Sequence, residues 1–263
     1  MSTDNIVQLA QEQPDTLLAC ILDMGEMLLA SGAEILRVED TVSRLCAAYG
    51  FQRINVFSIT SSIVITVQCL DGRICTQTRR IIVRDTNLQK IFLVNSLSRQ
   101  LCKKPISVAE LTERLEQIRV AKSNSLPILC ISYGLISSVF SVFFGGNFSD
   151  AIAAAISGVL VFVLQQFMGK LRMNGILQSL IVSAFTAFAV VLLVRVGIGQ
   201  TPEKITIGNI MLLIPGISFT TSLRDMINGD TISGLVGLSE AVVKAIAIAI
   251  GFAMVLVRFG GAL

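Results

Sequence analysis

The sequence contains no histidine, and its six cysteines include no Cys-x-x-Cys pair. Zinc sites are usually built from closely spaced cysteine and histidine ligands, so a metal site of this kind is excluded. The lack of histidine also removes the side chain that enzymes use most often as a general base. A Gly-rich phosphate loop and a Gly-x-Ser-x-Gly elbow are missing as well. We therefore expect no metal, no cofactor and no ATP coupling within this chain.

Positive charge is not concentrated anywhere in the chain. No run of five or more Lys and Arg occurs, and the 21 Lys and Arg against 18 Asp and Glu leave a net charge of only +3. This near balance excludes a typical nucleic-acid surface. Residues 1–15 have no apolar core, so no cleavable signal peptide is expected. Five of the six cysteines lie in residues 1–122, which favours free thiols in a reducing cytosol.

Apolar residues, by contrast, are abundant and unevenly spread. They make up 53% of the chain, and the mean hydropathy is +0.74. Residues 1–122 hold 14 Lys and Arg and 13 Asp and Glu, whereas residues 123–263 hold only 7 and 5. We therefore predict a cytosolic α+β domain over 1–122 and a transmembrane domain over 123–263.

The first half changes its hydrophobic period twice. Helical spacing from Pro14 to Gly50, interrupted at Ser31-Gly32, predicts two helices, and Ser31 with Glu34 fits a capping box for the second. β-branched residues then predominate over 53–83, with a hairpin signal at Asp71-Gly72. Two further helices are expected near 88–102 and 108–122.

The densest charged group of this half is the motif GAEILRVED, with Glu34, Arg37, Glu39 and Asp40. It fits a small-molecule or catalytic site. A solvated helix face with local ion pairs is the favoured interpretation.

The second half contains five runs that are almost free of charge and close to the ~20 residues that span a bilayer. They cover 126–144, 151–169, 173–194, 205–223 and 231–257. With the first half in the cytosol, Lys and Arg near the helix ends are more numerous on the cytosolic side. The fold class is therefore a polytopic α-helical membrane protein with five transmembrane helices and an N-terminal cytosolic α+β domain. A membrane location with the N-terminal domain in the cytosol is expected.

The fourth run is interrupted by Pro215 and Gly216. Proline has no N–H, so the carbonyl of Met211 loses its helical partner and the helix should kink or break there. Such a break is tolerated in a bilayer only inside a bundle or along a cavity. A half-helix that begins at Gly216 would direct its positive dipole end towards a carboxylate.

The fifth run carries Glu240 and Lys244, with Glu240 about 14 Å into its helix. At this spacing the two can pair on one face. They either neutralise each other for insertion, or Lys244 binds a substrate carboxylate while Glu240 exchanges a proton. Intramembrane charge costs a few kcal/mol per group, which favours the functional interpretation. Neutral hydrogen bonds would come from side chains that also commonly bind their own helix backbone, namely Asn209, Ser218, Thr220 and Thr221.

Three segments together resemble the bacterial threonine/serine exporter (ThrE) family: LLASGAEILRVEDTVSRLCAAYG, VFSITSSIVITV and IPGISFTTSLRDMINGDTISGLVGLSEAVVKA. The resemblance runs from about Leu17 to Arg258, in the order of that family. It implies site residues at Gly32, Arg37, Glu39, Pro215, Gly216, Asp225, Gly229, Asp230, Gly234 and Glu240. Longer members often have Arg after the last glycine, where this chain has GLVGLSE, so a charge-dependent role there is in doubt.

The chain is similar to the shorter, split type of the family, which implies a separately encoded small membrane partner similar to YjjB. The leading hypothesis is a subunit of a proton-coupled exporter for a small carboxylate, either a succinate-like dicarboxylate or threonine and serine. The alternatives are a membrane-tethered enzyme that uses the GAEILRVED face, or a regulatory subunit whose partner forms the pathway.

Overall fold

The chain folds into two compact units. The computed structural model describes residues 13–82, 84–121, 125–171 and 173–259. The N-terminal unit comprises Met1–Ser123 with Ile217–Leu238, and the membrane unit comprises Asn124–Gly216 with Ser239–Leu263. A short segment from the second half of the sequence thus belongs to the N-terminal unit.

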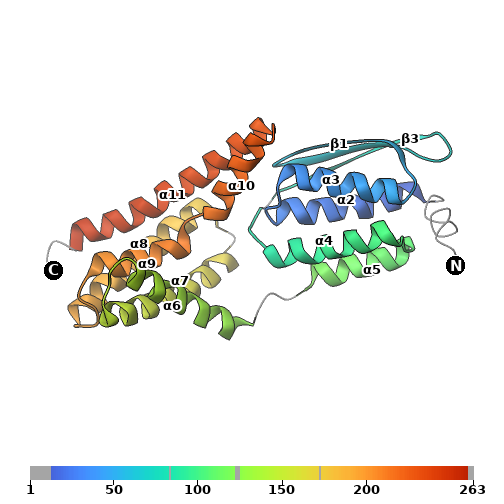
Figure 1. Ribbon diagram of the computed structural model, residues 1–263. Coiled ribbons are helices and arrows are strands. Elements are labelled where there is room, and N and C mark those ends of the chain that lie inside the picture. The colour runs from blue at the N-terminus through green and yellow to red at the C-terminus, as the bar shows by residue number, and fades with distance from the viewer. Residues whose placement is uncertain (1–12, 83, 122–124, 172, 260–263) are drawn as a thin grey trace. The chain divides into compact units, whose positions relative to one another are not determined.

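Four helices and a three-stranded sheet form the body of the N-terminal unit. They are α2 (Pro14–Ala30), α3 (Ile35–Ala48), β1 (Gln52–Ile59), β2 (Ser62–Gln68), β3 (Ile74–Arg80), α4 (Leu88–Lys103) and α5 (Val108–Arg119). The sheet is antiparallel with the order β1-β2-β3. Helices α2 and α3 lie between the sheet on one side and α4 and α5 on the other (Figure 1). The predicted α+β fold of this region is confirmed.

Two turns of this unit test the sequence analysis directly. Gly72 has φ +86° in the β2–β3 hairpin, as the Asp71-Gly72 signal predicts. Gly32, also at φ +86°, breaks the helices as expected. The predicted capping box, however, is wrong: Ser31 caps the C-terminus of α2, and the N-cap of α3 is Glu34, whose side chain makes no capping bond. Gly32 at φ +86° is not helical, so Ser31 cannot be the residue that directly precedes α3.

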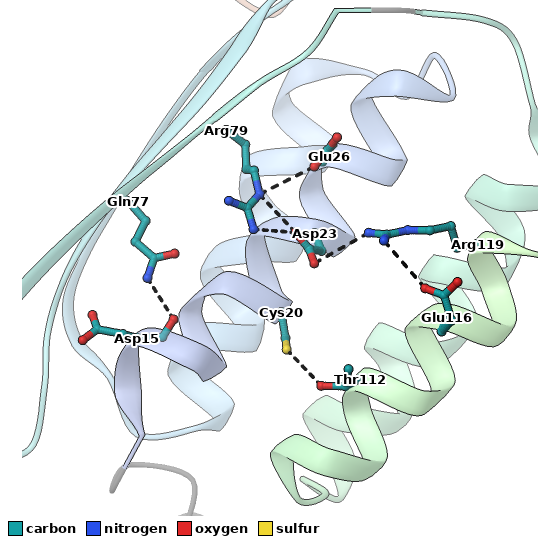
Figure 2. A network of polar contacts seen from close by, with 9 residues as sticks. All are labelled: Asp15, Cys20, Asp23, Glu26, Gln77, Arg79, Thr112, Glu116 and Arg119. Carbon is teal, nitrogen blue, oxygen red and sulfur yellow. Dashed lines mark hydrogen bonds and ion pairs between the residues drawn. The ribbon is translucent and has the colours of Figure 1, made fainter.

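The core of this unit is aliphatic and closed. Leu17, Ile21, Leu28 and Leu45 are fully buried, together with alternate residues of β2. At its edge, Asp23 of α2 accepts hydrogen bonds from Arg79 of β3, 2.7 Å away, and Arg119 of α5 lies 3.7 Å from the same carboxylate (Figure 2). Each ion pair is partly exposed and contributes little alone. Together they connect α2 to both neighbouring layers.

The second half of the chain forms six helices in the part that the structure describes. They are α6 (Leu126–Phe143), α7 (Phe148–Lys170), α8 (Gly175–Arg195), α9 (Pro202–Leu213), α10 (Gly216–Ile227) and α11 (Thr231–Phe259). By length and composition, α6, α7, α8 and α11 can each cross a membrane, and α9 with α10 makes a fifth span if the bent pair is counted as one. The predicted polytopic helical architecture is therefore confirmed, with one broken span.

Small residues let the helices of the membrane unit approach one another closely. A Cβ atom on Gly158 of α7 would lie 2.7 Å from the Ser137 Cβ and 2.9 Å from the Tyr133 carbonyl oxygen, both on α6. A Cβ on Gly208 of α9 would collide with the Ser137 carbonyl oxygen. Glycine is thus required where α6 contacts its two neighbours, as is typical of membrane helix interfaces.

Candidate functional site

The predicted break lies at Pro215. Helix α9 ends at Leu213, α10 begins at Gly216, and the two axes differ by 52°. The Ile214 amide still bonds to the Ile210 carbonyl oxygen at 3.0 Å, so regular α9 hydrogen bonding stops where proline removes the next donor. This prediction from the sequence is confirmed.

Polar residues of α10 lie on its exposed surface just after the break. Ser218 and Thr220 are both exposed. The Thr220 hydroxyl donates to the Ile217 carbonyl oxygen of its own helix at 3.0 Å. Thr220 therefore makes the local backbone bond that the sequence analysis gave as the alternative to a ligand contact.

Helix α10 contacts the N-terminal end of α3 within the N-terminal unit. The Ile35 amide donates to Asp225 Oδ1 at 3.1 Å, and Asp225 is only 2% exposed. Ile35 is the first residue of α3, so this carboxylate satisfies an unpaired amide at the positive end of the helix. Arg224 beside it forms an ion pair with Glu34. The two motifs that the sequence analysis treated separately thus meet, although they lie 190 residues apart.

The turn after α10 is a helix C-cap built on glycine. Gly229 has φ +101°, and its amide donates to the Met226 carbonyl oxygen at 3.2 Å. The Asp230 amide donates to the backbone carbonyl oxygen of Asp225 at 2.9 Å. This pair of bonds is the Schellman arrangement, which needs a left-handed residue. Asp230 then directly precedes α11. A Cβ on Gly234 would lie 2.6 Å from the Ser222 carbonyl oxygen, so α10 and the start of α11 form a tight hairpin.

Asn209 lies apart from these residues, in a buried polar network of the membrane unit. Its Oδ1 accepts from the Ser137 hydroxyl at 3.0 Å, and its Nδ2 donates to Ser157 Oγ at 2.7 Å and to the Ile205 carbonyl oxygen at 2.9 Å. The side chain is fully buried. Asn209 therefore connects α6, α7 and α9 in this structure.

The ionisable residues of α11 are differently placed. Glu240 is exposed and Lys244 is partly buried. Among the described residues, no ion pair joins them. The i, i+4 spacing permits such a pair but does not impose it, since both side chains are long and can extend away from each other.

The other two acids of the GAEILRVED motif contact β1 or α3 itself. Glu39 accepts from the Ser58 amide at 2.6 Å and from its hydroxyl at 3.0 Å, which fastens α3 to β1. Asp40 pairs with Arg44 of the same helix at 2.8 Å. Of these two contacts, only the Asp40–Arg44 pair matches the expected solvated helix face. Arg37 is exposed and takes part in neither contact.

Sequence analysis missed Asp150, a carboxylate that is 1% exposed at the start of α7. Its Oδ2 accepts from the Asn147 amide at 3.1 Å in a capping box. Its Oδ1 accepts from the amides of Gln200 and Thr201 at 2.7 and 2.8 Å, so it also fixes the loop between α8 and α9. The Asn-x-x-Asp spacing was the available signal. In the described part of the chain, no group of three acidic or cysteine side chains is arranged to hold a metal ion.

Comparison with known proteins identifies the family. The family model described as "Putative threonine/serine exporter" (ThrE) matches residues 19–258. The chain is 24% identical to the "Probable succinate transporter subunit YjjP" of Klebsiella aerogenes over 89% of this chain and 90% of that protein. It is 22% identical to the protein of the same name from Escherichia coli K12, over 95% and 97% of the two chains.

A third relative is longer than this chain. It is the "Threonine/serine exporter" of Corynebacterium glutamicum, 24% identical over 80% of this chain but only 44% of that protein. No solved structure matches the chain significantly. The family and these relatives are transporters rather than enzymes. With 240 consecutive residues of a multi-pass membrane chain covered by the family model, this protein belongs to the threonine/serine exporter (ThrE) family.

Proposed function

We propose that this chain is the subunit of a proton-coupled exporter that moves a small carboxylate out of the cytosol. Two of the relatives are named as succinate transporter subunits and the third as a threonine/serine exporter. Both kinds of solute carry a carboxylate and are small and polar. The proposed substrate is therefore a succinate-like dicarboxylate or a hydroxy amino acid.

The observation that carries this proposal is the exposed Glu240 within a membrane-spanning helix. A carboxylate that faces lipid near mid-membrane costs several kcal/mol, so such a group normally faces water or another protein. In the complete transporter, Glu240 would therefore line a polar path or contact a partner. It is the group we propose to take up and release the proton.

The broken span supplies the second element. Because α10 starts at Gly216, the amides of its first turn lie at the positive end of the helix dipole, although the Gly216 amide itself donates to the Ile214 carbonyl oxygen at 2.9 Å. Ser218 is exposed close to this end. We propose that the carboxylate passes this end of α10 and that Lys244 supplies the fixed positive charge, as in transporters with discontinuous helices.

The proposal includes a second protein. Because two relatives are named as subunits, and because the chain matches less than half of the longer exporter, we infer a separately encoded small membrane protein similar to YjjB. We place the pair in the bacterial inner membrane with the N-terminal domain in the cytosol, in line with the distribution of Lys and Arg.

Efflux from proteoliposomes that contain both proteins tests the proposal. Vesicles loaded with labelled succinate, threonine or serine are diluted with and without an imposed proton gradient. Glu240→Gln should abolish the dependence on the gradient, and Lys244→Met should reduce carboxylate efflux at least tenfold, because a charge-assisted contact is lost.

Matched controls exist at the start of α9, where Glu203→Gln and Lys204→Met make the same chemical changes outside the apolar part of the span. Both controls should transport normally. If Glu240→Gln and Lys244→Met also transport normally, neither residue belongs to the mechanism. If efflux persists with the partner alone, this chain is a regulatory subunit and the partner forms the pathway.

A further inference from the structure

A cleft on the N-terminal unit follows one face of α4. Its volume is about 450 Å³, and it is lined by residues along α4 and by Arg37 of α3. Small-molecule sites typically have volumes of about 300–1,000 Å³. The cleft is therefore large enough for a metabolite but small for a protein segment.

The lining carries three cations and no acid. Arg37, Arg99 and Lys103 all border the cleft. Helix α4 contains no Asp or Glu over its whole length, Leu88–Lys103. None of the three cations forms an ion pair within the residues that the structure describes. Three neighbouring cations without a carboxylate repel one another, and a bound anion would relieve that repulsion.

The acids nearest in sequence to Arg37 are all engaged elsewhere. Glu34 pairs with Arg224, Glu39 binds Ser58, and Asp40 pairs with Arg44. In the GAEILRVED motif the four charges look balanced, but in the structure all three negative ones are bound to residues other than Arg37. Arg37 is thereby left to face the cations of α4.

The remaining lining indicates what kind of anion fits. Leu88 and Phe92 border the cleft and are 59% and 70% exposed, so they offer apolar surface to a ligand. Asn95 adds a neutral hydrogen-bonding group between this apolar end and the cations. Guanidinium groups bind carboxylate and phosphate oxygens in a bidentate manner. The combination suits an organic molecule with a doubly charged acidic group and an apolar part.

We propose that the α3–α4 cleft is a binding site for a small organic dianion, either a dicarboxylate or a phosphate monoester. The residues that line the cleft are not those proposed for transport, and the proposal does not depend on the role of Glu240 or Lys244. Its concave form favours a small ligand over a flat lipid surface.

Calorimetric titration of the full chain in a neutral detergent tests the proposal, with phenyl phosphate, succinate and inorganic phosphate as probes. Phenyl phosphate should bind saturably and at least about tenfold more tightly than inorganic phosphate, because only the former can cover Phe92 and Leu88. Arg37→Gln and Arg99→Gln should each weaken binding about tenfold or more, and Phe92→Ala should remove the preference for the aromatic probe.

Lys103→Gln has a matched control in Lys104→Gln, because Lys104 is its exposed neighbour and does not line the cleft. Only the first should weaken binding. The double variant Glu240→Gln, Lys244→Met should bind as the unaltered chain does, which separates this site from the proposed transport path. Absence of saturable binding up to about 10 mM ligand would overturn the proposal. Equal effects of Lys103→Gln and Lys104→Gln on binding would also overturn it. Protection of α4 from hydrogen exchange only in bilayers of phosphatidylglycerol would overturn it too, and would identify a lipid-binding surface instead.

Discussion

The two units of this protein differ in the share of small polar side chains that they bury. In the N-terminal unit, the fully buried residues are large and aliphatic, such as Leu17, Leu28 and Leu45. In the membrane unit, the buried set includes many small polar residues: Ser137, Ser141, Ser157, Ser183, Thr186 and Asn209. Large apolar side chains such as Ile131 and Phe185 are 69% and 57% exposed there.

The difference follows from what surrounds each unit. Water drives apolar groups inward, and this effect accounts for the N-terminal core. Among lipid tails that drive is absent between helices, so close packing and hydrogen bonds between helices hold the bundle together. A buried serine in the membrane unit is therefore explained by close packing of the helices. An exposed glutamate such as Glu240 is not, and it indicates a functional role.

Exchanging the two kinds of buried residue should produce the largest difference in stability between the two units. Leu45→Asn places an unpaired amide in the N-terminal core and should lower its free energy of unfolding by about 4 kcal/mol. The reverse exchange, Asn209→Leu, removes bonds to Ser137 and Ser157. It should lower the stability of the membrane unit by only about 1 kcal/mol, as is usual for hydrogen bonds between membrane helices.

Hydrogen exchange of the full chain, read separately in peptides from α2–α3 and from α6–α9, measures both effects. Each variant should change protection in its own unit. If Asn209→Leu exposed α6–α9 as much as Leu45→Asn exposes α2–α3, the buried network of Asn209 would have a larger role than packing.

Glycine substitutions should show a smaller difference between the units. In Gly208→Ala the new Cβ meets the backbone carbonyl of Ser137, which cannot move without displacing α6, so about 2 kcal/mol should be lost. In Gly25→Ala the nearest atoms are side-chain methyl groups, Val42 Cγ2 at 2.9 Å and Ile63 Cδ1 at 3.2 Å.

Val42 is fully buried and stiff, so it must be displaced, but alanine favours the helix by about 1 kcal/mol and offsets part of that cost. Gly25→Ala should therefore lose about 1 kcal/mol, less than Gly208→Ala. Thermal aggregation of the two purified variants in detergent, followed by size-exclusion chromatography, compares them. Equal loss of folded protein would mean that the α6–α9 contact is no tighter than the contacts of a water-soluble core.

The sequence analysis was most accurate where the cause is local. Proline removes its own amide, so the break at Pro215 could be predicted, and the Asp71-Gly72 turn depends on two adjacent residues. Long apolar runs likewise predicted the spans. These features need no knowledge of distant partners.

The contacts that define the candidate sites are not local, and they could not be predicted. The residues next to Asp225 in the sequence do not indicate that its carboxylate accepts a hydrogen bond from the Ile35 amide. The charges of GAEILRVED suggested mutual pairing, yet their actual partners come from other elements in two of three cases. The isolation of Arg37 beside α4 follows only once those partners are known.

The smallest expected effect concerns the segment that the second half of the sequence contributes to the N-terminal unit. Asp225→Ala leaves the Ile35 amide without its acceptor and should raise the exchange rate of that amide, with a loss of about 1–2 kcal/mol locally. Arg224→Ala removes an ion pair whose arginine side chain is 64% exposed, so less than about 1 kcal/mol should be lost.

Asp225→Asn keeps an oxygen acceptor, so its loss of stability should fall between those of Asp225→Ala and Arg224→Ala. Asp225 and Arg224 lie on the same turn of α10, so their effects can be compared directly. A larger effect of Arg224→Ala than of Asp225→Ala would show that charge rather than the buried hydrogen bond holds α10 to α3. The contact between α10 and α3 would then weaken as ionic strength rises.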